Sequence, residues 1–179
     1  MGVNENIMIK IKKALISVSD KKNLKSLLIT LKKFKIEIIS SGGTFKEIKK
    51  LGFKCTEVSN YTNFPEILDG RVKTLHPKIY GGILNKRNNK KHLKNLKDNK
   101  IENIDLVVVN FYPFEKVIQN KIDHNNIIEN IDIGGPTMVR AAAKNYNYVT
   151  VISSTNQYEE LNKQLNLNNG STTLNFRKK

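Results

Sequence analysis

Cysteine, tryptophan and long apolar runs are scarce or missing in this sequence of 179 residues. The single cysteine, Cys55, excludes an internal disulfide and a zinc site built from several cysteines, and it is typical of a reducing compartment. No apolar run approaches the roughly 20 residues that a membrane-spanning helix requires. Residues 1–10 lack the apolar core of a secretory signal. We therefore expect a cytoplasmic protein with one ordinary domain, because the chain is too short for a second.

Acidic residues are also few, and 31 Lys and Arg against 16 Asp and Glu give a formal net charge of +15. Clustered cations can neutralise nucleic-acid phosphates, so a nucleic-acid surface is one interpretation. However, the excess is almost all lysine, and lysine recurs beside asparagine, as in residues 85–91 (NKRNNKK). This pattern favours a compositional bias of exposed positions over attraction of a small anion, and both over nucleic-acid binding. We expect no nucleic-acid partner and no membrane contact.

Short β-branched runs alternate with stretches of helical periodicity along the chain. This alternation predicts an α/β fold, a doubly wound, mainly parallel sheet flanked by helices. Residues 104–110 (IDLVVVN) are the clearest strand, because they are apolar on both faces. The segment 59–86 is rich in Gly and Pro and is predicted to be irregular, and the polar tail 166–179 is unassigned. The other expected strands are 13–18, 36–39, 53–58 and 148–152, and the expected helices are 21–34, 45–51, 91–99, 125–130, 136–145 and 157–165.

Polar segments follow several of these strands, at the edge where open α/β sheets bind ligands. Residues 17–21 (SVSDK) leave the first strand, and there Ser19 or Asp20 can cap the next helix. Free backbone N–H groups at that helix start would alternatively face an anion. Residues 40–44 (SSGGT) combine two glycines with hydroxyl donors, which suits a phosphate cradle and an ordinary tight turn equally.

A third segment, residues 70–77 (GRVKTLHP), carries two alternating cations. An extended backbone would place Arg71 and Lys73 on one side, where with the hydroxyl of Thr74 they suit a phosphate or a polar heterocycle. An exposed basic loop is the alternative. His76 precedes Pro77 and has no neighbouring cysteine or second histidine, so we expect it to be structural.

Two further segments complete the set. In residues 110–114 (NFYPF), Asn110 and Tyr112 would emerge at the ligand edge, where an amide and a phenol can polarise a carbonyl, although a plain turn is possible. In residues 131–145 (IDIGGPTMVRAAAKN), a basic helix face ends at Lys144, and Asp132 could meet it. A carboxylate near a lysine fits acid–base chemistry and a structural salt bridge alike. No spacing typical of metal ligands and no nucleophile–His–Asp pattern is present.

Five blocks, SVSDK, SGGT, GRVKTLHP, NFYPF and IDIGGPTMVRAAAKN, occur in this order between residues 13 and 154. Together they resemble the N-terminal domain of the bifunctional purine biosynthesis protein that combines IMP cyclohydrolase and AICAR transformylase. The resemblance implies a methylglyoxal-synthase-like fold over residues 10–165. It also implies dehydrative ring closure of the ribonucleotide FAICAR to IMP, the last step of de novo purine synthesis, without cofactor or metal.

Site residues follow from the same resemblance. It implies catalytic roles for Lys73, Tyr112, Asp132 and Lys144, with Asp132 and Lys144 as the proton-transfer pair and the other two orienting the substrate and stabilising charge. It implies substrate-binding roles for Ser19, Asp20, Lys21, Ser41, Gly42, Gly43, Thr44, Arg71, Val72, Thr74, Val109, Asn110 and Ile133.

The family's full-length protein continues into a larger transformylase domain, so residues 166–179 are expected to be a C-terminal extension that begins a missing half. Transformylase activity is not expected. The expected partners are a purine ribonucleotide, FAICAR or IMP, and a second copy of the chain in a homodimer. Three alternatives stay open: methylglyoxal synthase, whose carboxylate and histidine pattern is not found, a regulatory nucleotide-binding domain without the Asp132–Lys144 pair, and a nucleic-acid binder.

Overall fold

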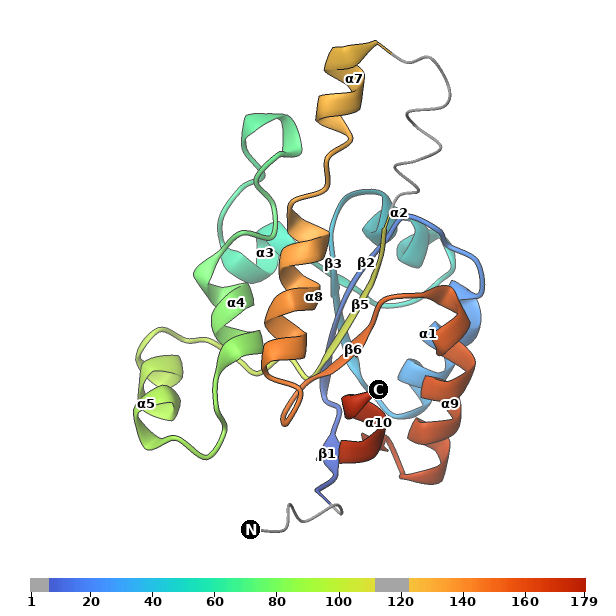
Figure 1. Cartoon of the computed structure of the whole chain (residues 1–179), viewed down its shortest axis with the longest axis vertical. Helices are drawn as coiled ribbons and strands as arrows, with labels where there is room; N and C mark the ends of the chain where they lie inside the picture. Colours follow the sequence, from blue (N-terminus) through green and yellow to red (C-terminus); the bar gives the residue numbers. More distant parts are fainter. Residues whose placement is uncertain (1–6, 112–122) are drawn as a thin grey trace.

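A five-stranded sheet forms the centre of the chain in this computed structural model, which describes residues 7–111 and 123–179 (Figure 1). Every neighbouring pair of strands in it is parallel, in the order β4-β3-β2-β5-β6. This architecture confirms the predicted α/β class with a parallel sheet. The strands are β2 (Lys13–Val18), β3 (Glu37–Ser40), β4 (Thr56–Glu57), β5 (Leu106–Asn110) and β6 (Thr150–Ile152).

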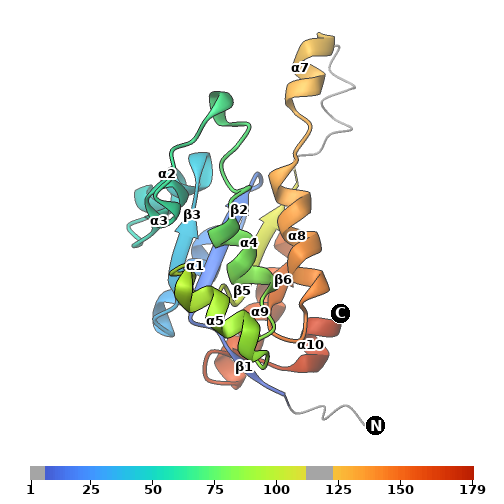
Figure 2. The same cartoon turned by 90° about the vertical axis from the view of Figure 1, so that its left-hand side faces the viewer.

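Helices cover both faces of this sheet (Figure 2). One face packs against α1 (Leu24–Lys33), α2 (Gly42–Lys50) and α9 (Tyr158–Leu167). The other packs against α3 (Val58–Thr62), α4 (Pro77–Leu84) and α8 (Gly134–Lys144). Two more helices, α5 (Lys90–Asp98) and α7 (His124–Glu129), lie outside these layers, and α7 projects beyond one end of the sheet (Figure 1). Within the described residues, no helix has the length and apolar character needed to cross a membrane.

The β5 strand shows why the sheet lies at the centre. All five of its residues are buried, with Leu106 and Val108 in one apolar cluster and Val107 and Val109 in the other. Successive side chains of a strand point to opposite faces, so a strand between two helical layers needs apolar residues at every position. Each such side chain contributes roughly 1.5–3 kcal/mol when fully buried. The continuous apolar run in the sequence is therefore a consequence of double-sided burial.

The region expected to be irregular contains helix α4, which the sequence did not indicate. The helix begins with Pro77 and is capped by His76, whose Nδ1 accepts a hydrogen bond from the Lys78 N–H at 3.1 Å. This contact confirms a structural role for His76. A Cβ at Gly82 would lie 2.7 Å from the carbonyl oxygen of Glu102, so glycine here permits close packing rather than a turn. The expected strand 53–58 is also wrong in extent, because β4 gives way to helix α3 at Val58.

The tail folds onto the same body. Strand β7 (Ser171–Thr172) pairs antiparallel with β1 (Ile9–Lys10), and helix α10 (Leu174–Lys178) follows it. The Arg177 side chain is buried and its guanidinium donates to backbone carbonyls, including those of Tyr146 and Thr172. Burial and the nearby Arg87 lower its pKa to about 10. Residues 166–179 are thus packed against the domain, and their interpretation as the start of a transformylase half stays a prediction.

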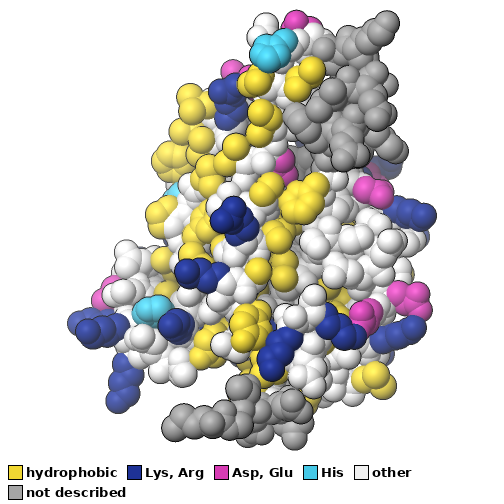
Figure 3. Space-filling view, in the orientation of Figure 1, with side chains coloured by type: hydrophobic (Ala, Val, Ile, Leu, Met, Phe, Trp, Pro, Cys, Tyr) yellow, Lys and Arg dark blue, Asp and Glu magenta, His cyan; other side chains and the backbone are white. Residues whose placement is uncertain are grey.

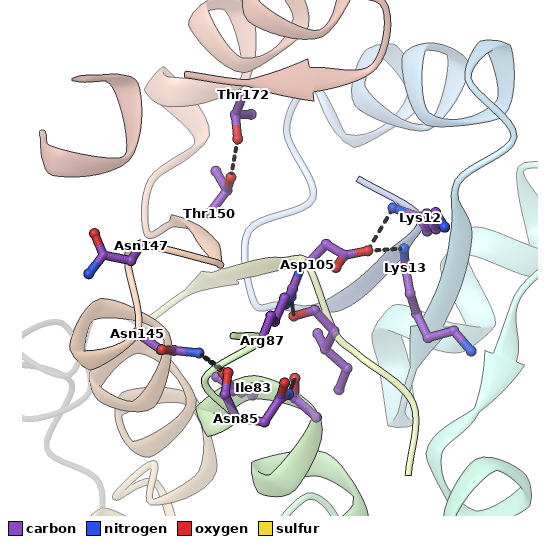
Figure 4. Close-up of polar contacts among 12 residues, drawn as sticks. Lys12, Lys13, Ile83, Asn85, Arg87, Asp105, Asn145, Asn147, Thr150 and Thr172 are labelled. Atoms are coloured by element: carbon purple, nitrogen blue, oxygen red, sulfur yellow. Dashed lines mark hydrogen bonds and ion pairs between the residues drawn. The ribbon is translucent and has the colours of Figure 1, made fainter. Parts of the chain in front are cut away.

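A buried carboxylate fixes the amino end of the sheet (Figure 4). Asp105 Oδ2 accepts hydrogen bonds from the backbone N–H groups of Lys12, at 2.7 Å, and Lys13, at 3.0 Å. Its Oδ1 lies 2.7 Å from Nη1 of Arg87. Because the Asp105 side chain is 4% exposed, this ion pair replaces the water that the carboxylate loses on folding.

A second buried contact at this end joins two helices. Asn145, just after α8, donates from Nδ2 to the carbonyl oxygens of Ile83, at 2.6 Å, and Asn85, at 2.9 Å (Figure 4). These carbonyls lie at the end of α4, where a helix leaves its last C=O groups without internal partners. The amino end of the sheet is therefore tied together by buried side-chain contacts.

Candidate active site

A cavity of about 720 Å³ opens at the opposite end of the sheet, beyond the carboxyl ends of β2 and β5. Its size lies within the range of roughly 300–1,000 Å³ that small-molecule sites occupy. The lining comes from the end of β2, the first turn of α2, residues 69–75, Asn110 and the segment from α7 into α8. This is the edge where parallel α/β sheets bind ligands.

Most of the predicted site residues line this one cavity, although they are spread over more than 100 positions of sequence. The residues brought together are Ser19, Lys21, Ser41, Gly42, Gly43, Thr44, Arg71, Lys73, Thr74, Asn110, Asp132 and Ile133. Asp20, Val72, Val109 and Lys144 are not among the lining residues. Tyr112 lies outside the described residues.

Three of the residues that do not line the cavity have evident structural places. Val109 is 1% exposed and belongs to the core under α8. Val72 forms an isolated antiparallel bridge with Ile67, which closes the loop before the cavity. Asp20 accepts a hydrogen bond from the Lys22 N–H at 2.8 Å through its carboxylate. These positions support the cavity wall.

Lys144 requires a correction. It is exposed and is the last residue of α8, whereas Asp132 precedes the first residue of the same helix. At 1.5 Å per residue, the ends of an 11-residue helix are roughly 15 Å apart. Figure 1 shows α8 running from the cavity end to the amino end of the sheet. Asp132 and Lys144 therefore do not form the expected proton-transfer pair within one chain.

The loop that leaves β2 is held by two side chains, one at the end of β5 and one in the first turn of α2. Asn110 accepts hydrogen bonds from the N–H groups of Ser19 and Asp20, at 2.7 and 2.8 Å, and donates to the Asp20 carbonyl at 2.7 Å. The hydroxyl of Thr44 accepts from the Val18 N–H at 3.0 Å and donates to the Val18 carbonyl at 2.9 Å. Both side chains are buried. The loop thus has a fixed shape.

These contacts correct two expectations. The N–H groups of Ser19 and Asp20 are not free to bind an anion, because both donate hydrogen bonds to Oδ1 of Asn110. The Oδ1 of Asn110 and one N–H of its amide are in turn occupied by the loop, so the side chain positions that loop. The hydroxyl of Thr44 is likewise committed to Val18.

The first turn of α2 is the better anion site. The helix begins at Gly42, earlier than expected, and its N-cap Ser41 makes no side-chain capping hydrogen bond. The first N–H groups of a helix have no internal acceptors and carry the positive end of the helix dipole. Gly42 has φ +53°, and a Cβ built there would lie 3.6 Å from Nζ of Lys73. The Lys73 ammonium therefore lies beside the first N–H groups of α2, which have no acceptor within the helix.

Both predicted cations of the 70–77 segment are paired with carboxylates. Arg71 donates from Nε to Oε2 of Glu129 at 3.1 Å and from Nη2 to Oε1 of the same residue. This pairing raises the pKa of Arg71 and lowers that of Glu129. Nζ of Lys73 lies 3.1 Å from Oε1 of Glu66. Neither Glu66 nor Glu129 was predicted as a site residue, although each carboxylate lies within a few residues of a predicted site segment.

Asp132 caps the turn into α8. Its Oδ1 accepts a hydrogen bond from the Gly135 N–H at 2.9 Å, and its Oδ2 has no donor among the described residues. A Cβ at Gly135 would lie 2.3 Å from Oδ2, and one at Gly134 would lie 2.7 Å from the hydroxyl of Thr74. The paired glycines thus allow helix, carboxylate and hydroxyl to approach closely. One carboxylate oxygen remains available to take up a proton.

Exposed apolar side chains surround the cavity mouth. Leu75, Ile128, Ile131 and Ile133 line it and are 41%, 44%, 48% and 54% exposed, respectively. In Figure 3, hydrophobic side chains gather over the upper part of the molecule, where α7 and the 63–75 segment lie. Across the described ranges, 7–111 and 123–179, no three His, Cys, Asp or Glu side chains lie together in a way that could hold a metal ion.

Comparisons with known proteins agree with this fold. Residues 23–137 match the family described as MGS-like domain. The chain is 46% identical over 172 residues to the bifunctional purine biosynthesis protein PurH of Cereibacter sphaeroides, and 49% identical over 168 residues to that of Persephonella marina. These alignments cover 96% and 94% of the chain but 32% of each relative, so the chain spans about a third of their length. A crystal structure of ForH superposes with a TM-score of 0.78 at 31% identity, covering 89% of this chain and 80% of that one.

Proposed function

This chain belongs to the MGS-like domain family, and from this premise we propose that it is an IMP cyclohydrolase of purine biosynthesis that closes the ring of FAICAR to form IMP. The observation that carries the proposal is the cavity itself. All five sequence blocks contribute at least one residue to its lining, from separate strands, helices and loops. Relatives named as purine biosynthesis proteins support the substrate class.

The reaction makes modest chemical demands. The carboxamide nitrogen of FAICAR attacks the formyl carbon, a C–N bond forms, and the resulting hydroxyl leaves as water after proton transfer. Rate enhancement then comes from holding the two groups together, stabilising the developing oxyanion and moving protons. A cavity built from fixed backbone and a few charged groups is suited to all three.

Within this proposal, the phosphate of the ribonucleotide binds at the first turn of α2. Gly42 and Gly43 present their N–H groups there, and Lys21 and Lys73 line the same cavity. An anion at a helix N-terminus is stabilised by both hydrogen bonding and the helix dipole. Arg71 supplies a third cation at the mouth.

The base and carboxamide would then lie toward α8. We assign Asp132 to proton transfer, because this residue lines the cavity and its Oδ2 has no donor among the described residues. We assign Lys73, whose Nζ lies near Gly42, to orienting the substrate and stabilising its negative charge. Tyr112, which lies outside the described residues, keeps the orienting role that the sequence resemblance implies. Lys144 receives no role in this chemistry, because it is at the far end of α8.

Turnover of FAICAR by the purified chain tests the proposal, followed by the absorbance change on IMP formation without added folate. We expect turnover that is inhibited by IMP. The control is Lys163→Ala, which removes an exposed lysine of α9 that pairs with Glu159 and not with a cavity residue. Absence of turnover by correctly folded chain would contradict the proposal, and tight IMP binding in that case would support a regulatory nucleotide-binding domain.

A further inference from the structure

Arg71 lines the cavity, and one edge of its guanidinium already donates hydrogen bonds to a carboxylate. Its Nε and one Nη bind the two carboxylate oxygens of Glu129 side by side. Glu129 is the last residue of α7 and is 58 positions away in sequence. This contact therefore joins α7 to the 63–75 segment, and both project beyond the same end of the sheet (Figure 1).

The environment of this pair is unlike that of a structural ion pair. The two side chains are 61% and 55% exposed, so neither has lost its water to the protein interior. Exposed pairs of this kind contribute little to stability and exchange partners readily. Both residues nevertheless line the cavity, where an anionic ligand would meet them.

A guanidinium edge binds a carboxylate and a phosphate in the same bidentate way. The edge of Arg71 that holds Glu129 therefore cannot hold a ligand phosphate or carboxylate at the same time. Glu129 also places a negative charge beside the cavity mouth, which repels an incoming anion. In both respects, Glu129 opposes the binding of an anion by Arg71.

We propose that Glu129 is an internal competitor for Arg71, which occupies the guanidinium while the cavity is empty and yields it to the anionic group of the ligand. The proposal rests on the proposed function to the extent that an anionic ligand binds in the cavity. Ligand binding then separates α7 from the 63–75 segment. Glu129 sets the affinity of the site for anions without touching the bound ligand.

The consequence can be expressed as a change in affinity. The apparent affinity equals the intrinsic affinity multiplied by the fraction of molecules in which the binding group is free. If Arg71 is free in about one molecule in five, removing the competitor tightens binding about fivefold. Glu129→Gln removes the charge and one acceptor oxygen but keeps the size of the side chain.

A matched control removes the effect of net charge. Glu159→Gln makes the same charge change in α9, where Glu159 pairs with Lys163 at 2.7 Å and is 80% exposed. It does not line the cavity. Any general gain in anion attraction therefore appears equally in Glu159→Gln, and the difference between the two variants reports the local competition.

The experiment is calorimetric titration of the full chain with IMP and, separately, with inorganic phosphate. We expect Glu129→Gln to bind both probes about fivefold more tightly than Glu159→Gln, and expect this gain to vanish in an Arg71→Ala background. Thermal melts confirm that each variant is folded. Equal or weaker binding by Glu129→Gln, or a gain that persists without Arg71, overturns the proposal.

The two probes separate this proposal from the proposed function. Phosphate binding that is tightened through Arg71, with no binding of IMP by any variant, supports the competition and contradicts the purine ribonucleotide as substrate. IMP binding that is unchanged by Glu129→Gln supports the purine ribonucleotide as ligand and contradicts the competition. Failure of every variant to bind either probe overturns both proposals.

Discussion

The two ends of the sheet carry the same kind of ion pair in opposite settings. At the amino end, Arg87 binds Asp105 with side chains that are 17% and 4% exposed. At the carboxyl end, Arg71 binds Glu129 with side chains that are 61% and 55% exposed. The buried carboxylate also accepts two backbone N–H groups, whereas Glu129 makes no such contact among the described residues. One pair fixes the fold, and the other is free to exchange its partner.

This contrast extends to the rest of each end. Asn145 and Arg177 use their side chains to bind backbone carbonyls of several segments at the amino end. At the carboxyl end, two helices begin with their first N–H groups near a cavity. The contacts at the amino end hold the sheet in place, and the cavity lies at its carboxyl end. A preorganised site requires such support, because groups held in place need no rearrangement when charge develops.

The largest effect is expected on turnover, from a substitution in the cavity at the carboxyl end of the sheet. Asp132→Asn removes the proposed proton acceptor but keeps an oxygen for the Gly135 N–H, so the fold should be unaffected. Turnover of FAICAR should fall about 10²- to 10⁴-fold, which is the usual contribution of a positioned acid or base. Steady-state kinetics measure the loss, and an unchanged thermal midpoint shows that it is chemical. Near-normal turnover would remove Asp132 from the mechanism.

Next in size is the loss of the buried carboxylate. Asp105→Ala leaves Nη1 of Arg87 and two backbone N–H groups without their acceptor. Breaking such a buried pair costs about 3–5 kcal/mol, so urea unfolding should shift to a much lower midpoint. Glu129→Ala is the matched change at the other end, and its unfolding midpoint should stay close to that of the parent chain because the pair is exposed. Similar losses in the two variants would contradict the contrast between the ends.

A smaller effect is expected from Asn110, the side chain that holds the loop after β2 at the carboxyl end of the sheet. Asn110→Ala leaves the N–H groups of Ser19 and Asp20 and one carbonyl unpaired, which should cost about 1–3 kcal/mol of stability. Because the same loop carries Lys21 into the cavity, KM for FAICAR should rise more than kcat falls. Asn99→Ala removes an exposed amide that bonds to Asn95 and serves as control. A fall in kcat with unchanged KM would indicate that Asn110 acts on the reacting atoms.

Much of this arrangement could be predicted from the sequence, for identifiable reasons. The buried strand β5 is apolar at each position, and four leucines at helical spacing indicate α1. Segments that follow parallel strands must meet at one edge, so Ser41 and Asn110 could be placed together without coordinates. Helix α4 could not be recognised, because its paired glycines serve close packing and resemble a turn in sequence.

The side-chain partners within the site could not be predicted either. Sequence spacing indicates that Asn110 lies at the cavity, but not that its amide is consumed by the preceding loop. The resemblance implied that Lys144 lies in the site. Its position in the structure follows from the direction and length of α8, which place it at the far end of that helix. Glu129 is 58 positions from Arg71, and no local pattern joins them. Such long-range pairs depend on how loops return to the sheet edge.

The most direct test of the account compares the two lysines assigned to catalysis by resemblance, one at each end. Lys73 lines the cavity, and Lys144 is exposed at the far end of α8. We would measure FAICAR turnover by Lys73→Ala and Lys144→Ala side by side, with thermal melts of both. The account predicts a loss of about 100-fold or more for Lys73→Ala and nearly full activity for Lys144→Ala. Full activity without Lys73, or an equal loss without Lys144, would contradict a site confined to this cavity of one chain.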